Sequence, residues 1–178
     1  FFQAEDGIRH SSTSRGLGDV YKRQAQGPLI LGMSKVEAES LAKELISVVG
    51  LDEKAYERFP HEFSGGQRQR IGIARSLAVK PEILIADEPV SALDVSIQAQ
   101  ILELLDQIRD QMNLAMIFIT HDLRVAAQVC DRVAVMRQGE VVETGSTSEL
   151  FSSPKHDYTQ ALLAAVPGKT WQEGILAN

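Results

Sequence analysis

Two acidic residues directly follow a short apolar run near the middle of this 178-residue chain. The run Ile83–Ala86 predicts a strand buried on both faces, as in a parallel sheet, and ligands bind at the carboxyl ends of such strands. Asp87 could hold Mg²⁺, partly through water. Glu88 could orient and deprotonate an attacking water molecule. Taken alone, the pair could equally be solvated acids at the end of a strand.

A second group of residues could hold an anion. Ser64, Gly65, Gly66 and Gln67 stand at the start of a helix predicted over about 66–79. The glycines let backbone N–H groups approach an anion closely, the helix start adds partial positive charge, and the Ser64 hydroxyl is a further donor. By itself, the motif could be no more than a helix cap with a flexible entry.

Two further motifs follow the acidic pair along the chain. Ser91–Asp94 comes directly after it, and Asp94 alone could be the cap of a helix over about 95–111. His121 follows a second apolar run, Ala115–Thr120. At the same edge of the sheet it could reach the same phosphate site, although a lone histidine is more often structural.

The helices and strands that must position these residues can be predicted from the periodicity of apolar residues and from the residues that start and end each element. Between residues 81 and 136 strands alternate with helices, which predicts an α/β domain with a largely parallel sheet. Ser34 and Glu37 have the spacing of a capping box, and Gln138-Gly139 predicts a hairpin turn. The predicted helices are about 35–49, 66–79, 95–111, 121–129, 147–151 and 157–165, and the predicted strands 83–86, 115–120, 133–136 and 140–143.

Composition narrows the class of protein. The formal net charge is −6, which argues against a nucleic-acid-binding surface. One cysteine, Cys130, excludes an internal disulfide and a multi-cysteine metal site. The apolar runs are much shorter than the ~18 residues of a membrane span, so the protein is not expected to cross a bilayer by itself, although it could dock on something that does.

In their order along the chain, the four motifs (64–67, 87–88, 91–94 and His121) resemble the signature, Walker B, D-loop and H-loop of the ABC-type ATPase domain, over residues 25–166. The stretches 61–71, 87–100 and 153–163 further resemble the oligopeptide/dipeptide importer subfamily, which usually has proline where Asp157 stands. Importers of nickel, glutathione and other small solutes share these features, so the transported solute stays open.

The resemblance implies a P-loop NTPase-type fold in which two such domains pair head to tail with ATP between them. Residues 64–67 would then contact the partner's ATP. Asp87 would hold Mg²⁺, Glu88 would be the general base, and His121 would contact the γ-phosphate. Asp94 would lie at the dimer interface.

The string G-x-x-x-x-G-K-[ST], which would cradle the phosphates, does not occur in the sequence. The chain is therefore expected to be the C-terminal part of the domain and inactive alone. Residues 25–80 would form part of the helical subdomain and the signature helix, and 81–166 the core and C-terminal extension. Residues 1–24 resemble translated adapter sequence and are expected to be non-native or disordered, and 167–178 to be a loose tail.

The function expected of the full-length protein is that of an ATPase coupling ATP hydrolysis to uptake of oligopeptides or dipeptides at the cytoplasmic face of the membrane. Its expected partners are a second ATPase subunit, in a homo- or heterodimer, the permease subunits and, indirectly, a solute-binding protein. One alternative is a soluble ABC ATPase acting on ribosomes or DNA, which the absence of basic patches disfavours. The other is an inactive, signature-donating fragment.

Overall fold

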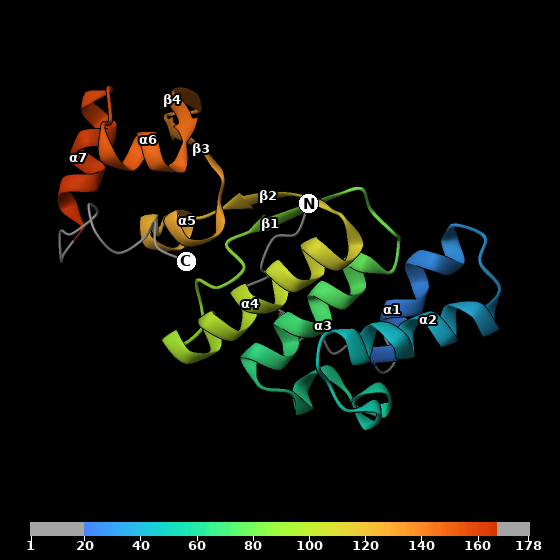
Figure 1. The fold of residues 1–178 in the computed structure, drawn as a ribbon. Coiled ribbons are helices and arrows are strands. Elements are labelled where there is room, and N and C mark those ends of the chain that lie inside the picture. Colours follow the sequence, from blue (N-terminus) through green and yellow to red (C-terminus); the bar gives the residue numbers. More distant parts are fainter. Residues whose placement is uncertain (1–19, 167–178) are drawn as a thin grey trace. The chain divides into compact units, whose positions relative to one another are not determined.

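The computed structural model describes residues 20–166, and these fall into two compact units that divide between Ile117 and Phe118. Along the chain (Figure 1), the elements of the first unit and the strand at its end are α1 (Val20–Ile30), α2 (Lys35–Val48), η1 (Glu53–Glu57), η2 (Pro60–Glu62), α3 (Gly65–Leu77), β1 (Ile83–Asp87), α4 (Val95–Met112) and β2 (Ala115–Ile119). The second unit continues with α5 (Leu123–Val129), β3 (Arg132–Arg137), β4 (Glu140–Ser146), α6 (Thr147–Ser152) and α7 (Asp157–Ala165).

Helices form the core of the first unit. α1 and α2 pack on each other and on α3, and α3 packs along α4 (Figure 1). The most deeply buried side chains on these helices include Ile46, Leu77, Ile101 and Ile108. The predicted capping box starts α2, because Ser34 Oγ accepts from the Glu37 N–H at 3.3 Å and the Glu37 carboxylate accepts from the Ser34 N–H at 3.0 Å.

Strands β1 and β2 pair in one sheet, and α4 connects them. The Ala115 N–H donates to the Glu82 carbonyl at 3.1 Å, which joins the start of β2 to the residue before β1. Strands paired start to start through a helical crossover run parallel. Asn113 ends α4 in the left-handed conformation, with φ 50°, as C-terminal caps often do.

The prediction that β1 is buried on both faces is wrong for the described residues. Leu84 and Ala86 are buried, whereas Ile83 is 55% exposed and Ile85 is 39% exposed. Successive side chains of a strand point to opposite faces, so one face of β1 is covered and the other is open. β2 has a similar open side, since Ile117 and Ile119 are about half exposed.

The second unit is built on the antiparallel hairpin β3–β4, as predicted. Its turn places Gln138 and Gly139 at φ 53° and 86°, the two positive values that a tight hairpin turn needs. α6 packs on both strands and on α5. The Glu143 carboxylate of β4 accepts the backbone N–H groups of Lys155 and His156, at 2.8 and 3.1 Å, just before α7 begins.

One α-helix, α1, and the two short 3₁₀ helices η1 and η2 were not predicted. α1 lies across the boundary expected between residues 24 and 25, and Gln24 and Ala25 are 1% and 2% exposed. The remaining elements start and end close to the predicted residues. The rest of the segment 1–24 and the tail 167–178 lie outside the described residues. Between residues 20 and 166, no helix combines the length and apolar character that spanning a membrane requires.

Candidate functional site

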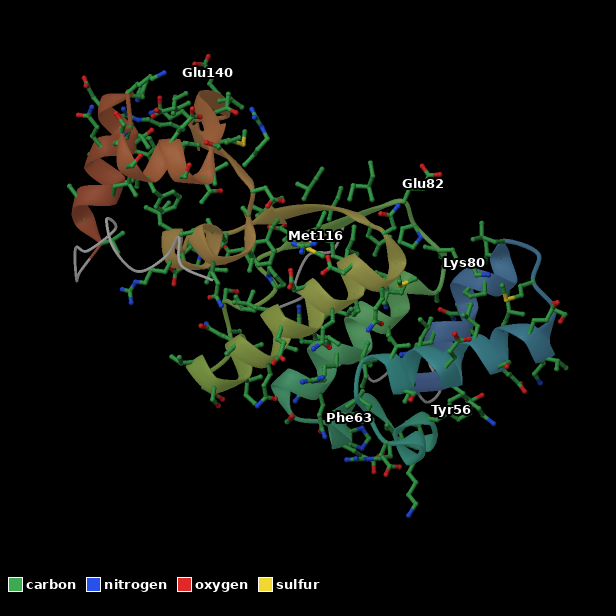
Figure 2. The ribbon with its side chains drawn as sticks, viewed as in Figure 1. Tyr56, Phe63, Lys80, Glu82, Met116 and Glu140 are labelled. Atoms are coloured by element: carbon green, nitrogen blue, oxygen red, sulfur yellow. The ribbon has the colours of Figure 1, made fainter. Side chains whose placement is uncertain are left out.

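The segment that enters α3 is anchored before the signature motif begins. Phe63, labelled in Figure 2, is 3% exposed and packs with Ile46 and Ala55 in one apolar cluster. The Arg68 side chain donates to the Phe63 carbonyl at 3.1 Å, and the Arg58 guanidinium lies 4.5 Å above the Phe63 ring. The next residue, Ser64, is therefore held at a defined place at the start of α3.

Ser64 and Gln67 form a reciprocal capping box at this helix start. The Ser64 hydroxyl oxygen accepts from the Gln67 N–H at 3.3 Å, and Gln67 Oε1 accepts from the Ser64 N–H at 3.0 Å. The amides of Gly65 and Gly66 lie in the first turn, where a helix offers no intrahelical acceptors. Ser64 and Gly65 are exposed, so this turn is open to solvent, and anion binding there stays a prediction.

Gly66 has a packing role as well. A Cβ added at Gly66 would lie 2.5 Å from Ile97 Cγ2, whereas one at Gly65 would lie 3.5 Å from Leu93 Cδ2. The first distance is far inside ordinary van der Waals contact, and the second is normal contact. The first turn of α3 is thus seated against the motif 91–94 and the start of α4, and any side chain at position 66 would force Ile97 to shift.

The acidic pair lies at the end of β1, and both carboxylate residues are half-buried. Glu88 has φ 48°, a left-handed conformation that is uncommon for a residue with a side chain. The Glu88 carbonyl accepts from the Ser91 N–H at 3.3 Å and from the Ser91 hydroxyl at 3.2 Å. Because backbone strain of this kind clusters at functional sites, it supports a functional role for Glu88.

The turn after Glu88 is also tied to α4. The carbonyl of Val90, a residue only 4% exposed, accepts from the Leu93 N–H at 3.2 Å and from the Gln98 side chain at 2.9 Å. Sequence reasoning missed Gln98, since nothing in the sequence distinguishes it from the other glutamines of the same helix.

Asp94 is the N-cap of α4. Its Oδ1 accepts from the Ile97 N–H at 3.0 Å and from the Ser96 hydroxyl at 2.8 Å. The Ile97 N–H, followed by the Ser96 hydroxyl, holds the pKa of Asp94 below its ordinary value. The carboxylate is therefore negatively charged at neutral pH, while it fixes the start of the helix that carries Ile97.

His121 is exposed and lies between β2 and α5, in the second unit. Thr120 Oγ1 accepts from the Asp122 N–H at 3.0 Å, and the Asp122 carboxylate caps α5 by accepting from the Arg124 N–H at 2.8 Å. Hydrogen bonds made by Thr120 and Asp122, the residues on either side of His121, thus fix the short segment that carries it.

The first unit gathers the signature motif, the acidic pair and the motif 91–94 around the starts of α3 and α4. Among residues 20–166, no three His, Cys, Asp or Glu side chains are grouped so as to hold a metal ion. Mg²⁺ commonly takes only one or two carboxylates and completes its shell with water and phosphate oxygens. A half-buried Asp87 at a strand end is compatible with that mode of binding.

Comparison with known proteins identifies a family. The ABC transporter family model matches residues 3–91. The match begins inside the segment 1–24, whose non-native origin stays a prediction.

Curated relatives include the oligopeptide transport ATP-binding protein OppF of Streptococcus mutans, 50% identical over 134 residues, which cover 75% of this chain and 44% of the relative. OppD of Bacillus subtilis, also an oligopeptide transport ATP-binding protein, is 55% identical over 137 residues, 76% of this chain and 38% of the relative. The dipeptide transport ATP-binding protein DppF of Lactococcus lactis is 49% identical over 145 residues, 80% and 46% of the two chains. The matched part thus spans less than half the length of each relative.

Two solved structures resemble the fold. One is cbiO1 from Clostridium perfringens, part of the ABC transporter complex cbiONQ, with a TM-score of 0.69 and 28% identity over 76% of this chain and 54% of that chain. The other is the ATP-binding cassette MJ0796, a dimer in a post-hydrolysis state bound to ADP and Pi, with a TM-score of 0.63 and 32% identity over 74% and 57% of the two chains. Both matches show that the elements described above have the fold of an ATP-binding cassette.

Proposed function

Because this chain belongs to the ABC transporter family, we propose that it is part of the ATP-hydrolysing subunit of an importer, in which hydrolysis drives uptake of oligopeptides or dipeptides across the cytoplasmic membrane. The observation that carries the proposal is the seating of the signature turn, at Gly65 and Gly66, against Leu93 and Ile97. It joins an anion-binding helix start to the turn that carries the acidic pair. The oligopeptide and dipeptide relatives support the substrate class.

The roles proposed for the site residues follow from their chemistry. Residues 64–67 bind phosphate oxygens through first-turn amides and the Ser64 hydroxyl. Asp87 contributes one carboxylate to Mg²⁺. Glu88 removes a proton from the attacking water as the phosphoryl group is transferred, and His121 donates a hydrogen bond to the γ-phosphate. Positioning and charge stabilisation supply most of the catalysis in this class of reaction.

The proposed assembly contains two ATPase subunits, which form a homo- or heterodimer. They bind permease subunits at the cytoplasmic face of the membrane, and a solute-binding protein delivers the solute to the permeases. Asp94 lies at the interface between the ATPase subunits. The dimer recorded for MJ0796 supports this pairing. The net charge of −6 supports protein partners rather than nucleic acid.

The test is Glu88→Gln in the whole subunit, assembled with its permeases in proteoliposomes. We expect ATP binding to be kept, ATP turnover to fall by roughly 10²–10⁴-fold, and the closed dimer to accumulate. Uptake of labelled di- and oligopeptides should stop in parallel. The control is Glu103→Gln on the exposed side of α4, which should leave both activities unchanged. Near-normal turnover by the Glu88 variant would rule out the base assignment.

A further inference from the structure

α4 is joined to the turn that carries Glu88 by a side chain to which none of the motifs assigns a role. Gln98 Nε2 donates to the Val90 carbonyl at 2.9 Å, and this is the shortest of the hydrogen bonds described within the turn 88–93. We propose that Gln98 is a positioning residue for ATP hydrolysis, which acts by holding the turn 88–93 so that the Glu88 carboxylate stays aimed at the attacking water. The inference rests on the proposed function of Glu88.

The need for such a restraint lies in the backbone of Glu88. A left-handed φ of 48° persists only where the surrounding structure over-determines it. The two bonds that Ser91 makes to the Glu88 carbonyl are long, at 3.2 and 3.3 Å, and Ser91 itself is exposed. Without a fixed Val90 carbonyl, the turn can relax toward ordinary dihedral angles and carry the carboxylate away.

Gln98 is well placed to supply that restraint. It lies in the first turns of α4, which the Asp94 cap and the core residues Ile101 and Leu102 hold in place. The neighbouring Ile97 is the side chain against which Gly66 packs. The hydrogen bond from Gln98 therefore ties the turn to the same part of α4 that seats the signature helix. Loss of this donor should be felt in catalysis more than in folding, because Val90 keeps the bond from Leu93.

The experiment compares Gln98→Met with Gln107→Met in the reconstituted transporter. Methionine keeps the length of glutamine and removes the donor, and Gln107 is an exposed glutamine on the same helix. We expect Gln98→Met to lower kcat for ATP by about tenfold, the effect of losing one positioning hydrogen bond, with KM changed by less than about twofold. In the Glu88→Gln background it should lower residual turnover no further.

Hydrogen exchange gives a readout independent of turnover. The amides of Ser91 and Leu93 should exchange faster in the Gln98→Met variant, and those within β1 should not. If the Met variant does not accumulate, Gln98→Glu keeps the shape and replaces the donor by an oxygen, and the same results are expected.

Equal behaviour of the two Met variants, or an undiminished effect of Gln98→Met in the Glu88→Gln background, would overturn the inference. A Glu88→Gln protein with normal turnover would instead overturn the proposed function, so that the two failures are distinguishable.

Discussion

Replacing Gly66 by alanine should destabilise the first unit, whereas the same change at the adjacent Gly65 should not. The added Cβ would lie 2.5 Å from Ile97 Cγ2 at position 66 but 3.5 Å from Leu93 Cδ2 at position 65. The Ile97 side chain must therefore retreat by about 1 Å to reach normal contact. Overpacking of this kind costs about 1–3 kcal/mol. Alanine in a helix gains about 0.5–1 kcal/mol over glycine, so we expect a net loss of up to roughly 2.5 kcal/mol for Gly66→Ala.

The assay is urea-induced unfolding of the two alanine variants alongside the parent chain, followed by circular dichroism. Gly65→Ala should unfold at the parent midpoint or slightly above it, and Gly66→Ala at a lower urea concentration. The source of the effect can be tested by repeating Gly66→Ala in an Ile97→Ala background. There the clashing Cγ2 is gone, so the further cost should nearly vanish, and the two changes should be strongly non-additive.

Two results would refute this reasoning. If Gly66→Ala and Gly65→Ala have the same midpoint, α3 is not seated on Ile97 as described. If Gly66→Ala is equally costly with and without the Ile97 side chain, the cost comes from the backbone at position 66 and not from the packing between α3 and α4.

Three further predictions concern other parts of the chain. Gln24→Leu should raise the free energy of unfolding by about 1–3 kcal/mol in urea titrations, because both polar atoms of this buried side chain lack hydrogen-bond partners. Glu88→Asn should stabilise the chain by about 1 kcal/mol while ATP turnover is lost, because asparagine tolerates the left-handed conformation better; unchanged stability would argue against strain there. The backbone N–H of Lys155, followed by the Thr159 side chain and the backbone N–H of His156, holds the pKa of Glu143 below its ordinary value of 4.5, so the stabilising effect is present above about pH 4.5 and is lost as the pH falls through the lowered pKa. The protection of α7 amides against hydrogen exchange, measured relative to the intrinsic exchange rate at each pH, should therefore fall on acidification in the parent, and much less so in Glu143→Gln.

Elements with strong local signals were predictable from the sequence. The Ser34–Glu37 capping box marked the start of α2, Asp94 marked that of α4, and Gln138-Gly139 marked the hairpin turn. Each signal depends on interactions within a few residues. Tertiary packing leaves these local interactions in place. The motif residues of the candidate site are found at such element ends, and their residue types, order and spacing carried the resemblance to the family that the comparison confirms.

Other features depend on contacts between distant segments and had no local signal. α1 contains Pro28 and has a weak apolar period, and it is held by its packing on α2 and α3. An apolar run such as Ile83–Ala86 does not indicate whether one face of a strand or both are covered by other elements. In this strand one face is open. Gln98 matters because of the carbonyl that it meets at Val90, which its position in a helix does not reveal.

The capping box at Ser64 affects how genetic variants at this position can be interpreted. Its hydroxyl oxygen accepts from the Gln67 N–H, while its hydroxyl hydrogen is the part able to donate to a phosphate. Ser64→Ala removes both the acceptor for the helix cap and the proposed donor to phosphate. A loss of transport in that variant could therefore come from a weakened helix start, from weakened nucleotide binding or from both. Ser64→Asp keeps an acceptor for the cap but brings a negative charge to the proposed phosphate site. A strain that carries the aspartate and accumulates normal amounts of protein without transport would therefore separate the two contributions of one side chain.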